Sequence, residues 1–365
     1  MKSKKEQYYK IEPILEKKCQ YNLIIGERSN GKTYAVLLRI IKRWVELGEQ
    51  GAYIRRWKED YKGKRANQLF ENHIINGEIS KATNGEWNSV KYVSGAWYLS
   101  KKDGDLDKFI TQEEPFCYAF ALSDMEHDKS AAYPLVTTIA FDEFLTRSYY
   151  LPNEFVILMN VLSTIIRLRD NATIFMMANT VNKYAPYFKE MGLRHIADMK
   201  HGQIDVYSYG ETKLKVAVEY CESPNKEGKK SDVYFAFDNP SLSMITGGAW
   251  EIDIYPHKPM DFKRNNIIFT FFISFNDSLL QCEVIYINDC KFIYIHQKST
   301  PIQDEDKDII FSELYDPRPN HFRNIRKGTS KLESKLSWFF INDKVFYQDN
   351  EVGEVVRNYL QYCKS

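Results

Sequence analysis

The sequence lacks the marks of several protein classes. Its six cysteines form no C-x-x-C pair, and its seven histidines show no metal-ligand spacing, so we expect neither a disulfide framework nor a zinc site. No stretch approaches the roughly 20 apolar residues of a membrane span, and the N-terminus has no apolar signal-peptide core. These absences predict a protein of a reducing cytosol with no membrane contact.

An excess of one charge is also missing. Fifty Lys and Arg against 49 Asp and Glu give a net charge of +1, which excludes a protein that coats polyanions by bulk charge. Residues 1–70 nevertheless contain 17 Lys or Arg and 8 Asp or Glu. This local excess favours a polyanionic ligand near the N-terminal part.

The apolar pattern predicts about two domains in 365 residues. Apolar runs at 21–25, 116–122, 135–141 and 172–178 predict buried strands, and 51–57 is a further short strand candidate. Helical periodicity follows Thr33 and recurs at about 153–168. This alternation is typical of an α/β sheet covered on both faces. Runs at 267–275, 280–287 and 291–297 predict an antiparallel meander, followed by helices after about 330. We predict domains at 1–220 and 259–365, joined by a linker over 221–258.

A phosphate-binding pattern lies between the first strand and the first helix. The pattern G-x-x-x-x-G-K-[ST] is matched by Gly26, Glu27, Arg28, Ser29, Asn30, Gly31, Lys32 and Thr33. In this setting the backbone N–H groups of the loop face nucleotide phosphates. Lys32 would add a positive charge and Thr33 a hydroxyl ligand, which predicts a site for ATP and Mg²⁺.

The run at 135–141 leads into Asp142 and Glu143. Asp142 would hold the metal, and Glu143 would act as the general base that orients the attacking water. A Glu directly after the Asp indicates the NTPase class with an extra strand between the phosphate-loop strand and the acid-pair strand, for which 51–57 and 116–122 are candidates. Asn179, after 172–178, would sense the γ-phosphate or cap the strand end.

Arginines end the second predicted helix, in the order Arg167, Leu168, Arg169. Either arginine could neutralise transition-state charge in an adjacent subunit, and Arg169 is favoured because it lies at the exit of the helix. The alternative is that both cations complement the helix C-terminus.

A basic segment with interleaved aromatic residues follows the second strand. Contacts to DNA phosphates are predicted for Arg56, Lys58, Lys62, Lys64 and Arg65. Arg55 and Arg56 could instead contact adenine or phosphate, and a solvated basic loop is equally open. Lys226, Lys229 and Lys230 in the predicted linker have the same ambiguity.

The order of these motifs resembles one family. The N-terminal phosphate loop, the acids in TTIAFDEF, the helix end LSTIIRLRD, the strand FMMANT and the trailing meander are similar to the DNA packaging ATPases, or encapsidation proteins, of small protein-primed podoviruses, which are related to large terminases. The resemblance implies a RecA-like P-loop ATPase domain of the ASCE class and a C-terminal α+β RNase H-like domain. It also implies that Lys129 faces the neighbouring active site.

The resemblance further implies the partners of such a motor. These are a homo-oligomeric ring, pentameric in the family, the portal of a procapsid and double-stranded DNA pumped inward, with an RNA scaffold left open. The setting would be the host cytoplasm, transiently at the procapsid vertex. The alternatives are a helicase-like ring ATPase, or a slow nucleotide-dependent assembly switch that does not need Glu143 as a base.

The C-terminal domain of the family resembles a nuclease that has lost its catalytic acids. Two-metal nucleases need clustered carboxylates, and the first strand of the predicted meander contains none. Asp277, Glu283 and Asp289 lie in the following turn and strands. We therefore expect no nuclease activity.

Overall fold

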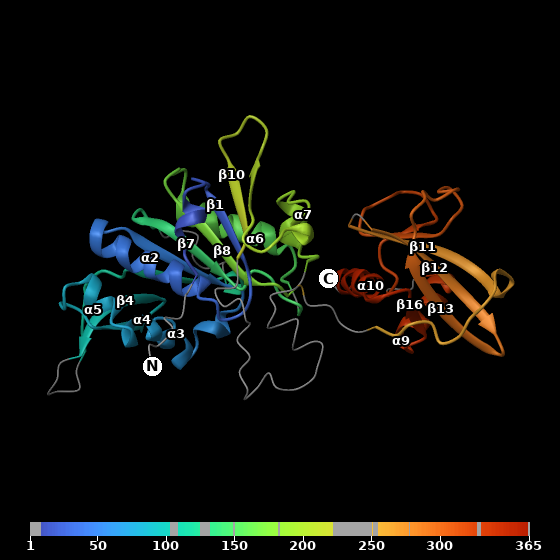
Figure 1. Cartoon of the computed structure of the whole chain (residues 1–365), viewed down its shortest axis with the longest axis horizontal. Coiled ribbons are helices and arrows are strands. Elements are labelled where there is room, and N and C mark those ends of the chain that lie inside the picture. The colour runs from blue at the N-terminus through green and yellow to red at the C-terminus, as the bar shows by residue number, and fades with distance from the viewer. Residues whose placement is uncertain are drawn as a thin grey trace, which may run out of the picture. The chain divides into compact units, whose positions relative to one another are not determined.

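A computed structural model describes residues 9–102, 109–124, 132–148, 150–181, 183–221, 250, 255–276, 278–326 and 330–363. The chain divides into two units, Met1–Trp250 and Glu251–Ser365 (Figure 1). Most of the predicted linker lies outside the described residues, as do Lys129, Lys226, Lys229, Lys230 and Asp277. Within the described ranges, no helix is long and apolar enough to cross a membrane.

A mixed sheet organises the first unit. Its spatial order is β3 (Ser89–Val93), β4 (Ala96–Lys102), β6 (Cys117–Ala121), β2 (Gln50–Arg55), β7 (Val136–Asp142), β8 (Thr173–Asn179), β1 (Tyr21–Gly26), β10 (Lys215–Tyr220) and β9 (Ile204–Ser208), with β5 (Phe109–Thr111) on β4. In the central part of this order, β6, β2, β7, β8, β1 and β10 run parallel to one another. Parallel strands are buried on both faces, which explains why their sequences are continuous apolar runs.

Helices cover both faces of this sheet. Ile24 of β1 packs with α2 (Lys32–Leu47), whereas Leu23 and Ile25 pack with α6 (Glu154–Ile166) and α7 (Pro186–Glu190). Successive strand residues point to opposite faces, so the two apolar clusters lie on opposite sides of the sheet. The short helix α1 (Glu12–Leu15) adds Ile14 to the α2 side. The predicted α/β sheet covered on both faces is therefore present.

The strand order corrects one expectation. The strand between β1 and β7 is β8, whereas β2 lies on the other side of β7 and β6 lies beyond β2. Parallel strands are joined by long crossovers, so a strand that comes late in the chain can insert between two earlier ones. Order along the sequence could not reveal this.

Residues 58–111 add small elements between β2 and β6. They are η1 (Lys58–Tyr61), α3 (Lys64–Gln68), α4 (Glu71–Ile75), α5 (Glu78–Ala82) and the strands β3, β4 and β5. Trp97 of β4 is fully buried, and its indole N–H donates to the Ala66 carbonyl at 2.7 Å. This contact ties the antiparallel hairpin β3–β4 to the short helices. Two further 3₁₀ turns, η2 (Leu122–Asp124) and η3 (Ile196–Asp198), follow later.

The second unit is built on its own sheet. After η4 (Arg264–Asn266), the strands β11 (Ile267–Phe275), β12 (Ser278–Ile287) and β13 (Cys290–Gln297) form the predicted antiparallel meander. The sheet order is β15 (His321–Phe322), β14 (Ile310–Ser312), β11, β12, β13 and β16 (Val345–Tyr347). Helices α9 (Lys331–Ile341) and α10 (Asn350–Tyr362) begin at the side-chain caps Ser330 and Asp349.

Candidate nucleotide site

The loop from Gly26 to Thr33 joins β1 to α2 and curls through left-handed backbone conformations. Ser29 and Gly31 have φ angles of 59° and 93°, and glycine tolerates this region without steric cost. A cavity of about 230 Å³ lies over the loop and is also lined by Asp142, Glu143 and Asn179. Arg28 is exposed on the loop and Glu27 is half-buried. The structure thus brings the predicted phosphate loop, the acid pair and Asn179 together.

Oxygen atoms surround the Lys32 ammonium inside the loop. Its Nζ donates to the Glu27 carbonyl at 2.6 Å, to Asn30 Oδ1 at 3.1 Å and to Asn179 Oδ1 at 3.4 Å. Only 5% of Lys32 is exposed, and this burial lowers the pKa of its amine. A buried ammonium whose partners are neutral oxygens is suited to receive an anion such as phosphate, which gives stronger hydrogen bonds.

Thr33 and Asp142 face each other across the site. The Thr33 hydroxyl lies 3.1 and 3.2 Å from the two Asp142 carboxylate oxygens, and the Tyr53 hydroxyl donates to Asp142 Oδ2 at 2.8 Å. Burial raises the pKa of Asp142, while Arg55, Tyr53 and Thr33 act in the opposite direction. Within the described residues, no group of three or more His, Cys, Asp or Glu forms a metal cage. One hydroxyl and one carboxylate suit Mg²⁺, which completes its shell with phosphate and water oxygens.

Glu143 follows β7 in a left-handed conformation, with a φ of 55°. Its backbone N–H donates to Asp142 Oδ1 at 3.0 Å, which holds this turn in place. The carboxylate pairs with Arg55 Nη2 at 2.8 Å. Arg55 also pairs with Asp60 at 3.0 Å and lies 3.8 Å from the Asp142 carboxylate. One guanidinium therefore connects both acids of the pair to the segment after β2.

Sequence reasoning did not find this role for Arg55 or the contact of Tyr53 with Asp142. Both residues lie on β2, which is parallel to β7 with Ile54 opposite Phe141. The carboxyl ends of parallel neighbours meet at one edge of a sheet, so the signal was available once β2 was placed beside β7. Arg55 and Glu143 are far apart in the sequence, so their pairing could not be predicted from local sequence patterns.

Arg56 corrects a prediction, because it is buried and does not face solvent where DNA would bind. Its Nε and Nη2 atoms pair with the Glu154 carboxylate at 2.7 and 2.9 Å, and its guanidinium donates to the carbonyls of Glu143 and Phe144 at 3.1 and 2.9 Å. The Tyr187 hydroxyl also donates to Glu154, at 2.6 Å. Arg56 therefore fixes the segment that follows the acid pair.

The other predicted DNA contacts are exposed. Lys58 pairs with Asp124 at 2.5 Å, and Lys62 pairs with Glu59 at 2.9 Å. Lys64 and Arg65 are exposed on α3. These two residues keep the basic character that the sequence suggested for this segment.

Arg169 corrects a second prediction. Its guanidinium donates to four main-chain carbonyls, those of Ile166 and Ile165 at 3.0 Å, Val136 at 2.8 Å and Tyr133 at 3.0 Å. Such an arginine closes the end of α6 and cannot reach a neighbouring subunit without breaking these bonds. Arg167 is exposed at the left-handed C-cap of the same helix.

A loop of this kind between a buried strand and a helix, with an acid pair at the end of a parallel strand, defines the class of P-loop nucleotide-binding proteins. Within that class, the chain belongs to the podovirus DNA encapsidation protein (Gp16) family, whose model matches residues 3–228. The match contains every residue of the site described above.

Individual relatives agree with this family. The chain is 36% identical over 175 residues to a DNA packaging protein of Bacillus phage B103, covering 47% of this chain and 48% of the relative. The match therefore spans about half the length of that relative. The fold is shared with a chain of the bacteriophage Phi-29 viral genome packaging motor assembly, with a TM-score of 0.56, 22% identity and coverage of 96% and 97%. It is also shared with the Phi-28 gp11 DNA packaging motor, with a TM-score of 0.55, 19% identity and coverage of 99% of each chain.

Proposed function

We propose that this protein is the ATPase subunit of a phage motor that moves double-stranded DNA into a procapsid. The observation that carries the proposal is the meeting of Lys32, Thr33, Asp142 and Glu143 at one edge of the sheet in a chain of the encapsidation family. Its relative from Bacillus phage B103 is a DNA packaging protein.

The residues of the site divide the work of hydrolysis. Lys32 and the loop N–H groups bind the phosphates, while Thr33 and Asp142 would hold Mg²⁺, which neutralises charge on the phosphates. Glu143 accepts a proton from the attacking water once its carboxylate is free of Arg55. Asn179, in contact with Lys32, lies where it can respond to the loss of the terminal phosphate.

The proposal includes a homo-oligomeric ring, pentameric as the family resemblance implies, docked on the portal of a procapsid in the host cytoplasm. With Arg169 occupied by the end of α6, Arg167 is the residue that acts on the neighbouring site. Lys62, Lys64 and Arg65 would contact DNA phosphates without reading bases, as a motor indifferent to sequence requires. The proposal makes no statement on whether an RNA scaffold joins the ring.

We also propose that the second unit is RNase H-like. Support comes from its antiparallel meander, to whose first strand β14 is added in parallel, with β15 parallel to β14. Of the carboxylates considered for a nuclease, Glu283 accepts a hydrogen bond from Gln281 at 2.8 Å and lies 3.5 Å from His296. The expected lack of nuclease activity stays a prediction.

Procapsid-dependent protection of DNA from nuclease, driven by ATP, tests this function. We expect protection with the full chain and loss of both protection and ATP turnover in Glu143→Gln, with nucleotide binding retained. The loss in turnover should be at least about 100-fold, as for a missing general base. Wild-type turnover by Glu143→Gln would overturn the assignment of the base. Strand displacement without a procapsid would favour the helicase-like alternative, which no comparison supports.

A further inference from the structure

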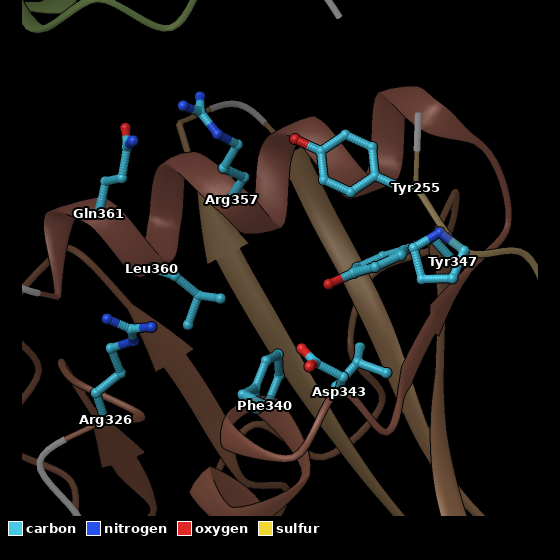
Figure 2. A pocket seen from close by; sticks show the side chains of 10 residues that line it. Tyr255, Arg326, Phe340, Asp343, Tyr347, Arg357, Leu360 and Gln361 are labelled. Carbon is cyan, nitrogen blue, oxygen red and sulfur yellow. The ribbon is translucent and has the colours of Figure 1, made fainter. Parts of the chain in front are cut away.

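A second cavity, of about 370 Å³, lies within the C-terminal unit. It is lined by residues from the C-terminal end of α9, from β16, from α10 and from the segment that begins at Tyr255 (Figure 2). The volume falls within the range of about 300–1,000 Å³ that is typical of small-molecule sites. No residue of this cavity belongs to the phosphate loop or the acid pair, so its chemistry is independent of the proposed ATPase site.

Tyr347 gives the first sign of a ligand. The residue is only 9% exposed, and its backbone N–H donates to the Pro256 carbonyl at 2.9 Å. Its hydroxyl faces the cavity (Figure 2) and has no hydrogen-bond partner among the described residues. The hydroxyl is not among the fully buried polar atoms that lack a partner, so it is open to water, and a ligand that replaces this water has to offer it a hydrogen bond. The hydroxyl therefore marks a polar contact point on the wall of the cavity.

Two guanidinium groups supply positive charge at the cavity. Arg326 is exposed and forms no ion pair within the described part of the chain. Arg357 on α10 is half-buried and lies 3.5 Å from Glu354. The Tyr255 hydroxyl also donates to the Glu354 carboxylate at 2.7 Å. Arg357 and Tyr255 therefore share this carboxylate. Arg326 is therefore the guanidinium suited to the oxygens of a phosphate, whereas Figure 2 shows the guanidinium of Arg357 directed away from Phe340 and Leu360.

The cavity is also lined by a negatively charged side chain, that of Asp343. Asp343, Phe340 and Arg326 all line the cavity, and in Figure 2 Phe340 is drawn between the two charged side chains. The side chains of Phe340 and Leu360 provide apolar surface between these charges. A matching ligand has an anionic end, a flat apolar middle and a hydrogen-bond donor at its far end. A fatty acid lacks the donor and would leave the Asp343 carboxylate without a partner in the ligand.

Tyr255 is held in the cavity wall by the absence of a side chain at Gly353. A Cβ placed on Gly353 would collide with the Tyr255 ring, so only glycine allows this close approach. The backbone N–H of Tyr255 also donates to Asn350 Oδ1 at 3.0 Å, and its ring meets that of Tyr347 edge-on at 5.5 Å. Two aromatic rings are thus fixed before any ligand arrives, which reduces the entropy cost of stacking.

We propose that this cavity binds one nucleotide unit, with its phosphate at Arg326, its base against the aromatic wall and its amino group at Asp343. Stacking on aromatic side chains beside arginine is the usual recognition of unpaired bases. A free mononucleotide and an unpaired residue of a nucleic-acid strand share this chemistry. Bases within a duplex are stacked and paired, so they do not fit.

The test uses the full chain in a Lys32→Ala background, which weakens nucleotide binding at the phosphate loop. AMP is titrated by calorimetry, and a labelled single-stranded oligoadenylate and its duplex are titrated by fluorescence anisotropy. We expect Arg326→Gln to weaken binding about tenfold and Tyr347→Phe, which keeps the ring, about fivefold. Lys335→Gln on the exposed side of α9 removes the same charge and should change nothing.

AMP and the oligoadenylate distinguish a free mononucleotide from an unpaired residue of a nucleic-acid strand as the ligand. Binding of AMP identifies a free nucleotide as sufficient, whereas binding of the oligoadenylate alone identifies a strand. Binding of neither probe, or binding that both cavity variants leave unchanged, overturns the proposal. Displacement of the probe by polyglutamate would show recognition of charge alone and would overturn it as well. Thermal melting of each variant distinguishes a lost ligand contact from a lost fold.

Discussion

The Arg55 guanidinium and the Glu143 carboxylate form an ion pair at 2.8 Å, between the end of β2 and the turn that follows β7. The pair holds the proposed general base while Arg55 also lies 3.8 Å from Asp142. The guanidinium fixes the orientation of this carboxylate and keeps it turned toward the end of β2. In the proposed mechanism Glu143 leaves Arg55 before it acts on water, so the conformation of the Arg55 side chain would control hydrolysis.

Removal of Arg55 should shift the pH dependence of ATP turnover. Burial raises the pKa of Asp142 and Arg55 opposes that rise, so Arg55→Gln should raise the pKa further. A protonated Asp142 cannot hold a metal ion, and the acidic limb of the kcat/KM profile should move to higher pH by about one unit. Lys62→Gln removes a nearby exposed cation and should leave the limb in place. An unchanged midpoint in Arg55→Gln would show that Asp142 does not limit the acidic side.

Lys32→Ala should weaken nucleotide binding at least about tenfold, since charge-assisted hydrogen bonds to phosphate are each worth about 1.5–3 kcal/mol. The measurement is a fluorescence titration with a labelled ATP analogue. Lys42→Ala, at an exposed position of the same helix α2, is the matched control and should bind as the wild type does. Equal affinities for the two variants would contradict the placement of phosphate at Lys32.

Arg56→Ala should destabilise the fold by about 3–5 kcal/mol, because it leaves the buried Glu154 carboxylate without its cation. Lys58→Ala removes an exposed ion pair with Asp124 and should cost about 1 kcal/mol or less. Urea unfolding measures both. If Arg56→Ala kept full stability and lost only DNA affinity, the original interpretation of Arg56 as a DNA contact would be restored.

Local sequence patterns predicted much of this molecule. The phosphate loop, the acids after β7 and the meander β11–β13 follow from residues close together in the chain, where backbone conformation and apolar periodicity are determined. Their positions match the observed elements. The two helices expected after Thr33 and near 153–168 are likewise present as α2 and α6.

Local sequence patterns could not predict ion pairs and hydrogen bonds between residues that are far apart in the sequence. Arg56 lies in a basic segment, which suggested a DNA contact. The fold instead places Glu154, 98 residues later, against Arg56, and the two side chains form a buried ion pair. The position of Arg169 at the end of a helix suggested an arginine that acts on a neighbouring subunit. In the fold, its guanidinium donates to the carbonyls of Tyr133 and Val136. An arginine in a sequence shows its charge but not the acceptors that the fold brings to it.

The last prediction separates the two arginines at the end of α6. Arg169→Ala removes the donors to four carbonyls and should lower stability by about 2 kcal/mol. Arg167→Ala, at an exposed position, should leave the melting temperature unchanged while it reduces ATP turnover. A loss of turnover with no loss of stability would show that Arg167 contributes to catalysis and not to the fold.

Mixed rings then test whether Arg167 acts on a neighbour. A Glu143→Gln subunit lacks the base but retains Arg167, and an Arg167→Ala subunit retains the base. Where the first lies beside the second, one complete site forms from two defective chains, so the mixture should recover ATPase activity that neither variant has alone. Action of Arg167 within its own subunit predicts no recovery, because every site would still lack one of the two groups.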